Sequence, residues 1–403
     1  MGQSLQDSIN TVYPGNEFSK VATSIGQFLK LEYGAGGAGV AGAYTALAKG
    51  AVSMAWNPAG LGFVTSPELY MSQNTLYAGI SSNYLGAGFP LGGANVLGIS
   101  VQYMSSGDME VTTLDYPDGT DEMFQANSMS LGLSFARRLT DRLSVGITGK
   151  YITESIYKET ASTFGFDVGS NFDLGIYGLI LGMSLQNFGG SARFDGPDLN
   201  YDMNTTKDIQ GHPELTSRLL TDEWPLPIVF RMGLRADLVG GMSPWKKSLS
   251  NRFTLLVDAN DPFDAALRGA LGFEYAWHEL FYVRGGYKIG YEWSVGYDVY
   301  EVEYNDAFDV GETYIDENDN KQWDAGEEFT DGLRVLVDTV KRDSWGSFYE
   351  NGRYPFKNFS VGTGINYNLY GTKLLFDYSL SNMGILGAVQ QVSLGMTFES
   401  KIT

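Results

Sequence analysis

Large apolar residues alternate with small polar residues along many short stretches of this chain. In the stretch 128–135, every second residue is Met, Leu or Phe, and every residue between them is Ser or Gly. The stretches 143–148 and 392–398 repeat the alternation. Because successive side chains of a strand point to opposite faces, this pattern predicts strands with one apolar face and one face of small polar residues.

About fourteen segments of this kind can be counted, and each is long enough to supply the roughly 9–11 residues that a tilted strand needs to cross a bilayer. An even number agrees with the antiparallel barrels of bacterial outer membranes. The predicted strands lie near 67–76, 80–90, 95–106, 125–138, 142–157, 162–174, 177–188, 226–238, 251–259, 267–276, 280–291, 356–367, 371–380 and 387–398.

The face opposite the apolar one distinguishes two folds. A soluble sandwich would bury its apolar face and turn a charged face to water. Here the second face is mostly Ser, Thr and Gly, which fits a packed interior better than a solvated exterior. We therefore expect an all-β, about 14-stranded antiparallel transmembrane barrel with its apolar face toward lipid, and the soluble sandwich stays as the alternative.

The connections and the aromatic residues fit the same fold. Three links are long, 107–124, 189–225 and 292–355, whereas others are short and polar, such as 139–142. Long extracellular loops on one side and tight periplasmic turns on the other are typical of outer-membrane barrels. Aromatic residues near strand ends would form interface girdles: Tyr275, Trp277, Tyr282, Tyr287, Tyr291 and Trp293.

The composition limits where the protein can be located and which partners it can bind. The 403 residues include 51 Gly, 25 Tyr and 23 Phe, and Cys is absent, which excludes disulfides and thiolate chemistry. A formal net charge of −20 argues against nucleic acid as a partner. The sequence has no run of 18 or more uncharged apolar residues and begins without the apolar core of a signal peptide. We expect an integral outer-membrane protein whose signal peptide has already been removed.

The N-terminal part differs from the strands. Residues 1–27 are polar and mixed and form an N-terminal extension, and residues 28–63 are rich in Gly and Ala. Within them, Ala41 to Lys49 favours a short helix. The barrel is expected over 64–403. Small residues at this density allow close backbone packing in a confined space.

Several motifs carry a resemblance to a known family. The segment Phe28-Leu29-Lys30, the Gly/Ala run to Ala46 and Trp56-Asn57-Pro58-Ala59-Gly60-Leu61 resemble the N-terminal hatch of PorV/PorQ-like proteins, and more distantly that of the FadL-like fatty-acid transporters. The stretches 224–227, 376–378 and 392–398 also resemble the PorV branch. The resemblance implies a fourteen-stranded barrel with an N-terminal plug, or hatch, in its lumen.

Four residues of the hatch segment are singled out: Trp56, Asn57, Pro58 and Gly60. Asn can hydrogen-bond its own backbone and Pro fixes φ, so Asn57-Pro58 predicts a tight turn. The turn belongs either to a plug element or only to the approach to the first strand. A direct ligand-binding role for Asn57 is the weaker third reading.

An acidic stretch near the third long link has the spacing of a calcium-binding loop. Calcium prefers hard oxygen ligands at alternating positions of a curled loop. The usual Gly at the sixth position is replaced by Lys321, so the alternative is a solvated acidic loop. The candidate ligands for Ca²⁺ are Asp316, Asn318, Asn320, Gln322 through its backbone carbonyl, Asp324 and Glu327.

Catalysis is not expected. Neither His212 nor His278 stands beside a nucleophile motif, and the Gly-rich run 34–42 lacks the strand and acidic partner of a dinucleotide site. No organic cofactor is expected. A plugged lumen also argues against an open porin.

Two functions follow from the resemblance, with a third left open. The first is a PorV-like partner or shuttle of type IX secretion, with a large translocon barrel or the C-terminal domains of secreted cargo as partners. The second is a FadL-like uptake channel for hydrophobic small molecules that pass through the lumen. The third is a surface-assembly scaffold. In each case outer-membrane lipid surrounds the barrel.

Overall fold

The computed structural model describes residues 23–117, 119–202, 216–241, 243–292, 297–303, 333–340, 344–346, 358–382 and 387–398. The chain divides into two compact units. One comprises Ser19–Gly290 with Gly346–Thr403, and the other comprises Met1–Phe18 with Tyr291–Trp345. In the latter, β19 (Tyr297–Glu303) and β20 (Leu333–Val340) form an antiparallel pair.

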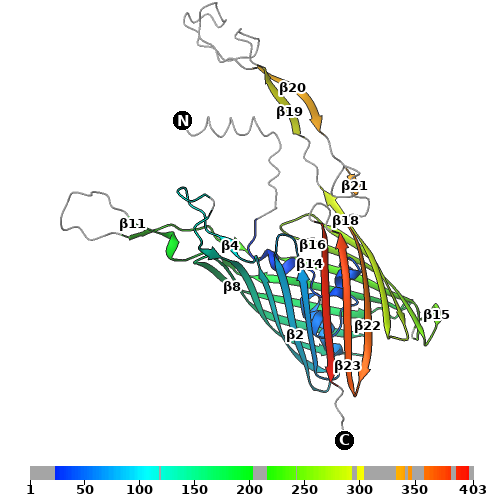
Figure 1. Cartoon of the computed structure of the whole chain (residues 1–403). Coiled ribbons are helices and arrows are strands. Elements are labelled where there is room, and N and C mark those ends of the chain that lie inside the picture. The colour runs from blue at the N-terminus through cyan, green and yellow to red at the C-terminus, as the bar shows by residue number, and fades with distance from the viewer. Residues whose placement is uncertain are drawn as a thin grey trace, which may run out of the picture. The chain divides into compact units, whose positions relative to one another are not determined.

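The larger unit is a closed antiparallel barrel of 14 strands (Figure 1). Each strand pairs with two neighbours, and closure comes from the pairing of β9 with β14. In ring order the strands are β1 (Glu68–Thr75), β2 (Ser81–Gly92), β3 (Asn95–Ser105), β6 (Ala126–Arg138), β7 (Leu143–Ile156), β8 (Glu159–Asp173), β9 (Leu179–Gly189), β14 (Val229–Gly240), β16 (Asn251–Pro262), β17 (Arg268–Trp277), β18 (Phe281–Glu292), β22 (Phe359–Leu369), β23 (Thr372–Asn382) and β24 (Ala388–Phe398).

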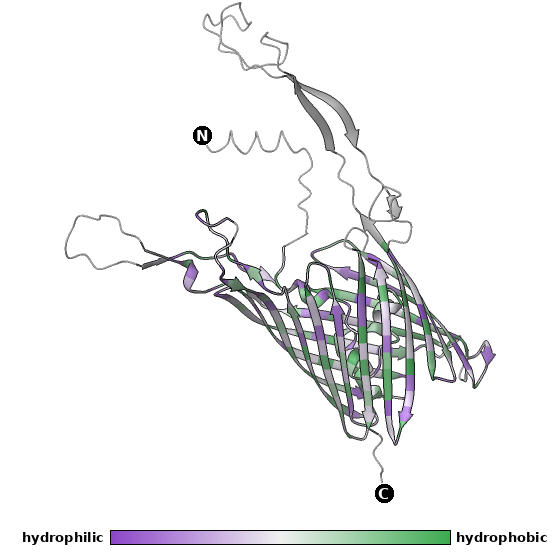
Figure 2. Cartoon of the chain, viewed as in Figure 1, coloured by the Kyte–Doolittle hydropathy of each residue, from purple (hydrophilic) through white to green (hydrophobic). Residues whose placement is uncertain are grey.

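The predicted fold is confirmed, and the strands begin and end within a few residues of the predicted limits. The apolar face of the alternation points outward: in β6, Leu131, Leu133 and Phe135 are exposed while Ser130 and Ser134 are buried. Figure 2 shows the same alternation of hydrophobic and hydrophilic residues along the strands. A continuous exposed apolar surface of this kind fits lipid rather than water. Among the described residues, no helix is long and apolar enough to span a bilayer.

The two ends of the barrel differ in their connections. Because neighbouring strands are antiparallel, the three longest links, 106–125, 190–228 and 293–358, all leave from one end, which we call the long-link end. The opposite, short-turn end has the turns 93–94, 139–142 and 278–280. Short elements in the links at the long-link end are β4 (Met109–Glu110), β5 (Met123–Phe124), β10 (Ser191–Ala192), η4 (Pro197–Leu199), β11 (Asn200–Asp202), β12 (Thr216–Arg218) and β13 (Trp224–Pro225). The remaining short strands are β15 (Lys246–Lys247) and β21 (Ser344–Gly346).

The described residues before β1, 23–67, contain short helices. These are η1 (Gln27–Lys30), α2 (Ala35–Gly39), η2 (Ala51–Ala55) and η3 (Pro58–Phe63). The predicted helix over Ala41–Lys49 is wrong. Ala41 and Gly42 have positive φ angles of 57° and 84°, and such left-handed residues end a helix. The composition of this stretch favours a helix, but it did not indicate that the backbone at Ala41 and Gly42 would prevent one.

Candidate functional site: the filled interior of the barrel

Residues 24–64 lie inside the ring, where Figure 1 shows them in blue. We call them the interior segment. Glycines on the inward faces of the strands let its backbone approach closely. An added Cβ at Gly182 of β9 would lie 2.7 Å from the carbonyl oxygen of Thr45, and one at Gly272 of β17 would lie 2.9 Å from that of Val40. Similar contacts on β7, β8, β18 and β22 show that the segment touches strands around the ring.

The predicted site residues Trp56, Asn57, Pro58 and Gly60 all lie in this segment and are buried. Asn57 caps η3, because its side-chain oxygen accepts a hydrogen bond from the backbone N–H of Ala59 at 3.2 Å, and Pro58 is the first residue of that helix. Its Nδ2 donates to the carbonyl oxygens of Thr45 at 3.1 Å and Ser170 of β8 at 3.0 Å. The side chain of Asn57 is thus occupied by contacts within the protein.

Trp56 lies at the centre of the interior segment. Its indole N–H donates to the carbonyl oxygen of Tyr33 at 2.7 Å, and its ring packs edge-on against Tyr44, with 5.4 Å between centroids. The guanidinium of Arg231 lies 4.9 Å from the Trp56 ring centroid. Gly60 packs against the carbonyl oxygen of Ala48, which leaves no room for a side chain. Hydrogen bonds and ring contacts therefore join distant parts of the segment.

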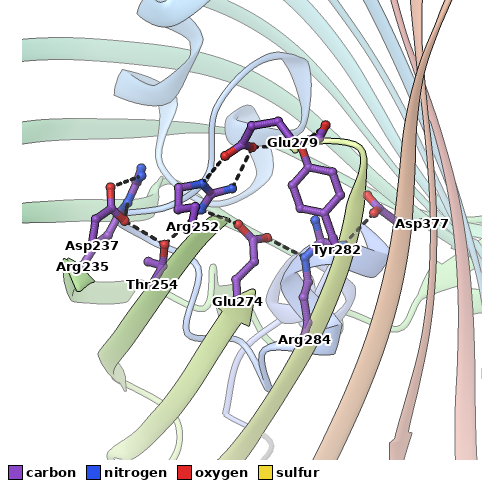
Figure 3. Close-up of polar contacts among 9 residues, drawn as sticks. All are labelled: Arg235, Asp237, Arg252, Thr254, Glu274, Glu279, Tyr282, Arg284 and Asp377. Carbon is purple, nitrogen blue, oxygen red and sulfur yellow. Dashed lines mark hydrogen bonds and ion pairs between the residues drawn. The ribbon is translucent and has the colours of Figure 1, made fainter. Parts of the chain in front are cut away.

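A chain of ionic groups lies on the inward faces of β14, β16, β17, β18 and β23 (Figure 3). Arg284 binds two buried carboxylates, Glu274 through Nε and Asp377 through Nη1, both at 2.6 Å. The other carboxylate oxygen of Glu274 binds Arg252 at 2.8 Å, and Arg252 binds Glu279 in the turn after β17 at 2.7 Å. We call this group the arginine network; its members are Arg235, Asp237, Arg252, Thr254, Glu274, Glu279, Tyr282, Arg284 and Asp377.

The remaining members extend the network to β14. Arg235 binds Asp237 at 2.7 Å, and the hydroxyl of Thr254 donates to the same carboxylate at 2.7 Å. Arg284 also lies against α2, since an added Cβ at Gly36 would lie 3.6 Å from its Cζ. The prediction that Tyr282 is an interface aromatic is wrong. Its side chain is buried and faces inward, and its hydroxyl donates a hydrogen bond to Glu279. Trp277 and Tyr287 are exposed on the outer face.

A second ionic group lies on β7, β8 and β9, toward the long-link end. Lys150 Nζ is 2.6 Å from Asp167 Oδ2 and donates to the side-chain oxygen of Asn187 at 3.0 Å. Asn187 has a φ of 59°, and its backbone N–H donates to Asp167 at a shift in the β8–β9 register. These three buried residues, the lysine cluster, satisfy the polar groups that an irregular pairing exposes.

Two adjoining cavities separate the interior segment from the wall at the short-turn end. Their volumes are about 260 Å³ and about 330 Å³. Both are lined by Tyr44, Lys49, Asn366 and Leu375. Glu68 and Lys373 also line the first cavity, and Arg235, Arg252 and Glu279 the second. Both walls therefore combine charged and polar side chains with apolar ones.

Other predicted residues lie elsewhere. The calcium candidates Asp316, Asn318, Asn320, Gln322, Asp324 and Glu327, together with His212, Trp293 and the side chain of Tyr291, lie outside the described residues. His278 is part of a turn in which its backbone N–H donates to the carbonyl oxygen of Ser250 at 2.6 Å. The sequence interpretation missed the interior charges, although Glu274 and Arg284 occupy the polar positions of alternating strands and the period of two would have placed them inside.

The ring closure and the filled interior define an outer-membrane type of barrel with an occupied lumen. The model of one family, the type IX secretion system protein PorV, matches residues 15–193, which include the interior segment and the strands from β1 to β9. This match confirms the resemblance to the PorV family that the motifs indicated. No curated protein sequence matches the chain significantly.

Several solved structures are similar to the chain over most of its length. The CymD monoaromatic hydrocarbon channel has a TM-score of 0.48 at 11% identity, with 91% of this chain and 97% of that chain covered. The Pseudomonas putida toluene transporter TodX has a TM-score of 0.46 at 11% identity, with 91% and 97% covered. A Pseudomonas aeruginosa FadL homologue has a TM-score of 0.44 at 11% identity, with 91% and 98% covered.

Proposed function

We propose that this protein acts as an outer-membrane partner of a type IX secretion route, without catalysis of its own. The observation that carries the proposal is the PorV match, which includes both the interior segment and the first seven strands of the ring, β1 to β9. In this role the long-link end faces the cell exterior and contacts a translocon barrel or a secreted C-terminal domain. The barrel itself anchors these contacts in lipid.

The filled interior supports a role in which the protein acts through its outer surfaces rather than as an open channel. The interior segment contacts the inward faces of strands around the ring, and Asn57 ties it to β8 at 3.0 Å. Such ties cost free energy to break, because each would leave a buried polar group without a partner. A secretion partner needs no open lumen, so these contacts fit its task.

Pull-down of the tagged full chain from detergent-solubilised outer membrane tests this role. We expect mass spectrometry to recover a much larger barrel protein or secreted chains that share a C-terminal domain. A variant with a shortened β3–β6 link, 106–125, should lose part of this recovery. A variant with a replaced short turn 139–142 serves as the matched control. Recovery of neither partner class by the unmodified chain would contradict the proposal.

The uptake of a hydrophobic molecule remains the competing function, because the similar solved structures are described as hydrocarbon channels. The two cavities do not favour it in this chain, since charged residues such as Arg252, Glu279 and Lys373 line them. Native mass spectrometry separates the two functions. A lipid or hydrocarbon retained in the barrel would support uptake, and an interior that stays empty of such molecules would support the secretion role.

For the acidic stretch we propose a calcium site, on the strength of the ligand spacing from Asp316 to Glu327 alone. A bound cation would offset the mutual repulsion of these carboxylates. Chelation with EGTA should increase protease cleavage within 298–345, and Ca²⁺ should restore protection where Mg²⁺ does not. The variant Glu327→Gln should be cleaved without chelation. An identical digest in all conditions would contradict the site.

A further inference from the structure

Exposed cations without an ionic partner gather at the short-turn end of the barrel. Five of them form no ion pair within the part of the chain that the structure describes: Arg137, Arg138, Arg142, Lys246 and Lys247. At the long-link end, by contrast, the exposed Lys158 binds Asp198 and the exposed Arg218 binds Asp195. The longest described link there, 106–125, contains carboxylates and no Lys or Arg.

The turns that carry or adjoin these cations form one continuous edge. They follow one another around the ring and are the segments 139–142, 174–178 and 241–250. The backbone N–H of Asp173 donates to the carbonyl oxygen of Arg142 at 2.8 Å, which joins the first two turns. The indole N–H of Trp245 donates to the carbonyl oxygen of Tyr177 at 3.3 Å, which joins the second turn to the third. We call the five cations on these turns and at the end of β6 the basic edge.

Carboxylates on the same turns do not balance the basic edge. Among the described residues the turns and the adjoining strand ends carry Asp141 and Asp173, and neither forms an ion pair. Asp173 instead accepts a hydrogen bond from the backbone N–H of Gly175 at 2.8 Å. Glu279, in the next turn, binds Arg252. The edge therefore carries an excess of positive charge, although the whole chain has a formal net charge of −20.

An ordered aromatic pair lies directly beside the two lysines. The rings of Tyr177 and Trp245 stack with 5.6 Å between centroids, and both side chains are exposed. The hydroxyl oxygen of Ser243 accepts hydrogen bonds from the backbone N–H groups of Trp245 at 3.1 Å and Lys246 at 3.3 Å. Trp and Tyr are enriched at the interface between a bilayer and water, where one part of the ring is apolar and another polar. The pair therefore indicates that these lysines lie at the depth of lipid headgroups.

Arg137 places one cation of the basic edge on the side of the wall that faces lipid. In β6 it continues the outward series of Leu133 and Phe135, which are both exposed. A long cationic side chain at the end of a strand extends along the apolar surface to the phosphates of the headgroups. A soluble acidic protein would not reach this side of the wall. The position of Arg137 therefore favours lipid as the anionic partner.

We propose that the basic edge binds the headgroups of anionic phospholipids in the leaflet at the short-turn end of the barrel. Lys246 and Lys247 bind the headgroup phosphate by charge-assisted hydrogen bonds, and the acyl chains lie against the apolar wall. Trp245 and Tyr177 contact the region between headgroup and chains. The inference goes beyond the proposed secretion role and does not depend on it, because none of these residues belongs to the long links.

Fluorescence quenching by brominated lipids tests the site on the full chain in vesicles. The emission of Trp245 is the difference between each chain and the same chain with Trp245→Phe. Brominated phosphatidylglycerol should quench this emission more strongly than brominated phosphatidylcholine at the same mole fraction. Lys246→Gln should lower that preference about fivefold, the usual effect of one cation near anionic lipid. Lys246→Gln combined with Lys247→Gln should lower it further, and Lys→Arg at both positions should keep it.

The matched control removes two exposed cations from the opposite end, Lys158→Gln with Arg218→Gln, and should leave the preference unchanged. Equal quenching of Trp245 in the unmodified chain by the two lipids would overturn the proposal. So would a preference that survives in the double lysine variant. Binding of polyglutamate to the unmodified chain serves as the test for an acidic protein partner. If the lysine substitutions abolish that binding and leave the lipid preference intact, the basic edge binds protein and the lipid site is wrong.

Discussion

The lysine cluster and the arginine network lie in the same interior but are built differently. Lys150, Asp167 and Asn187 are almost completely enclosed and satisfy one another. The arginine network is larger, joins five strands and borders a cavity. The first group supports an irregular pairing of β8 and β9, whereas the second joins strands of the wall beside a cavity. Charges inside one barrel thus have two roles, and the difference can be measured.

The largest effect is expected from Arg284→Met. The substitution leaves Glu274 and Asp377 buried without their shared cation, and breaking such a buried pair costs about 3–5 kcal/mol. The free energy of unfolding, measured by guanidinium titration of the chain in lipid vesicles, should fall by this amount. Arg252→Met is the control and should cost less, because Glu274 keeps its contact with Arg284 and the other partner of Arg252, Glu279, is 55% exposed. Equal losses in the two variants would remove the distinction between buried and accessible members of the network.

Lys150→Met should have a smaller effect, near 3 kcal/mol, at the lower limit of that range. Only one carboxylate loses its cation, and Asp167 still accepts a hydrogen bond from the backbone N–H of Asn187 at 2.8 Å. The loss should appear as faster amide exchange in β8 and β9. The double variant Lys150→Met with Asp167→Asn should recover part of the stability. Failure of the double variant to recover any would argue against a specific ion pair.

The sequence predicted the wall of the barrel much better than its contents. The period of two in stretches such as 128–135 depends only on which face meets lipid, and that requirement is local. The contents depend on contacts between distant residues, for example Asn57 with Ser170 and Arg284 with Asp377. Pattern reasoning could have placed these charges inside, but it could not have paired them.

The interior segment shows the same limit of prediction from local sequence. Composition favoured a helix after Ala41, because Ala, Leu and Lys are good helix formers. The structure instead fits the segment to the glycines of the wall, and the backbone N–H of Thr45 donates to Asp258 at 2.8 Å rather than to a helical carbonyl. Tertiary contacts therefore override local propensity where the backbone is confined. The motif Asn57-Pro58 was recognisable because its turn is set by neighbouring residues.

The smallest effect concerns a third ion pair, at the long-link end, which is more accessible than the other two. Lys30 Nζ lies 2.9 Å from Asp264, and Ser24 and Gln27 also donate to that carboxylate. Burial alone would raise the pKa of Asp264, but the hydrogen bonds of Lys30, Ser24 and Gln27 outweigh it and hold the pKa below its ordinary value.

A carboxylate whose pKa is lowered on folding stabilises the fold above its unfolded pKa of about 3.9, and this contribution is lost as the pH falls through the folded value. We therefore expect amide exchange of residues 24–31, corrected for the intrinsic rate, to increase as the pH is lowered from 6 to 3. Asp264→Asn should exchange rapidly already at pH 6, while β6 and β7 stay protected. If the variant and the unmodified chain exchange alike at pH 6, the Lys30–Asp264 pair does not stabilise the position of the interior segment. In that case the enclosed lysine cluster and the arginine network would be the ionic groups that matter for stability.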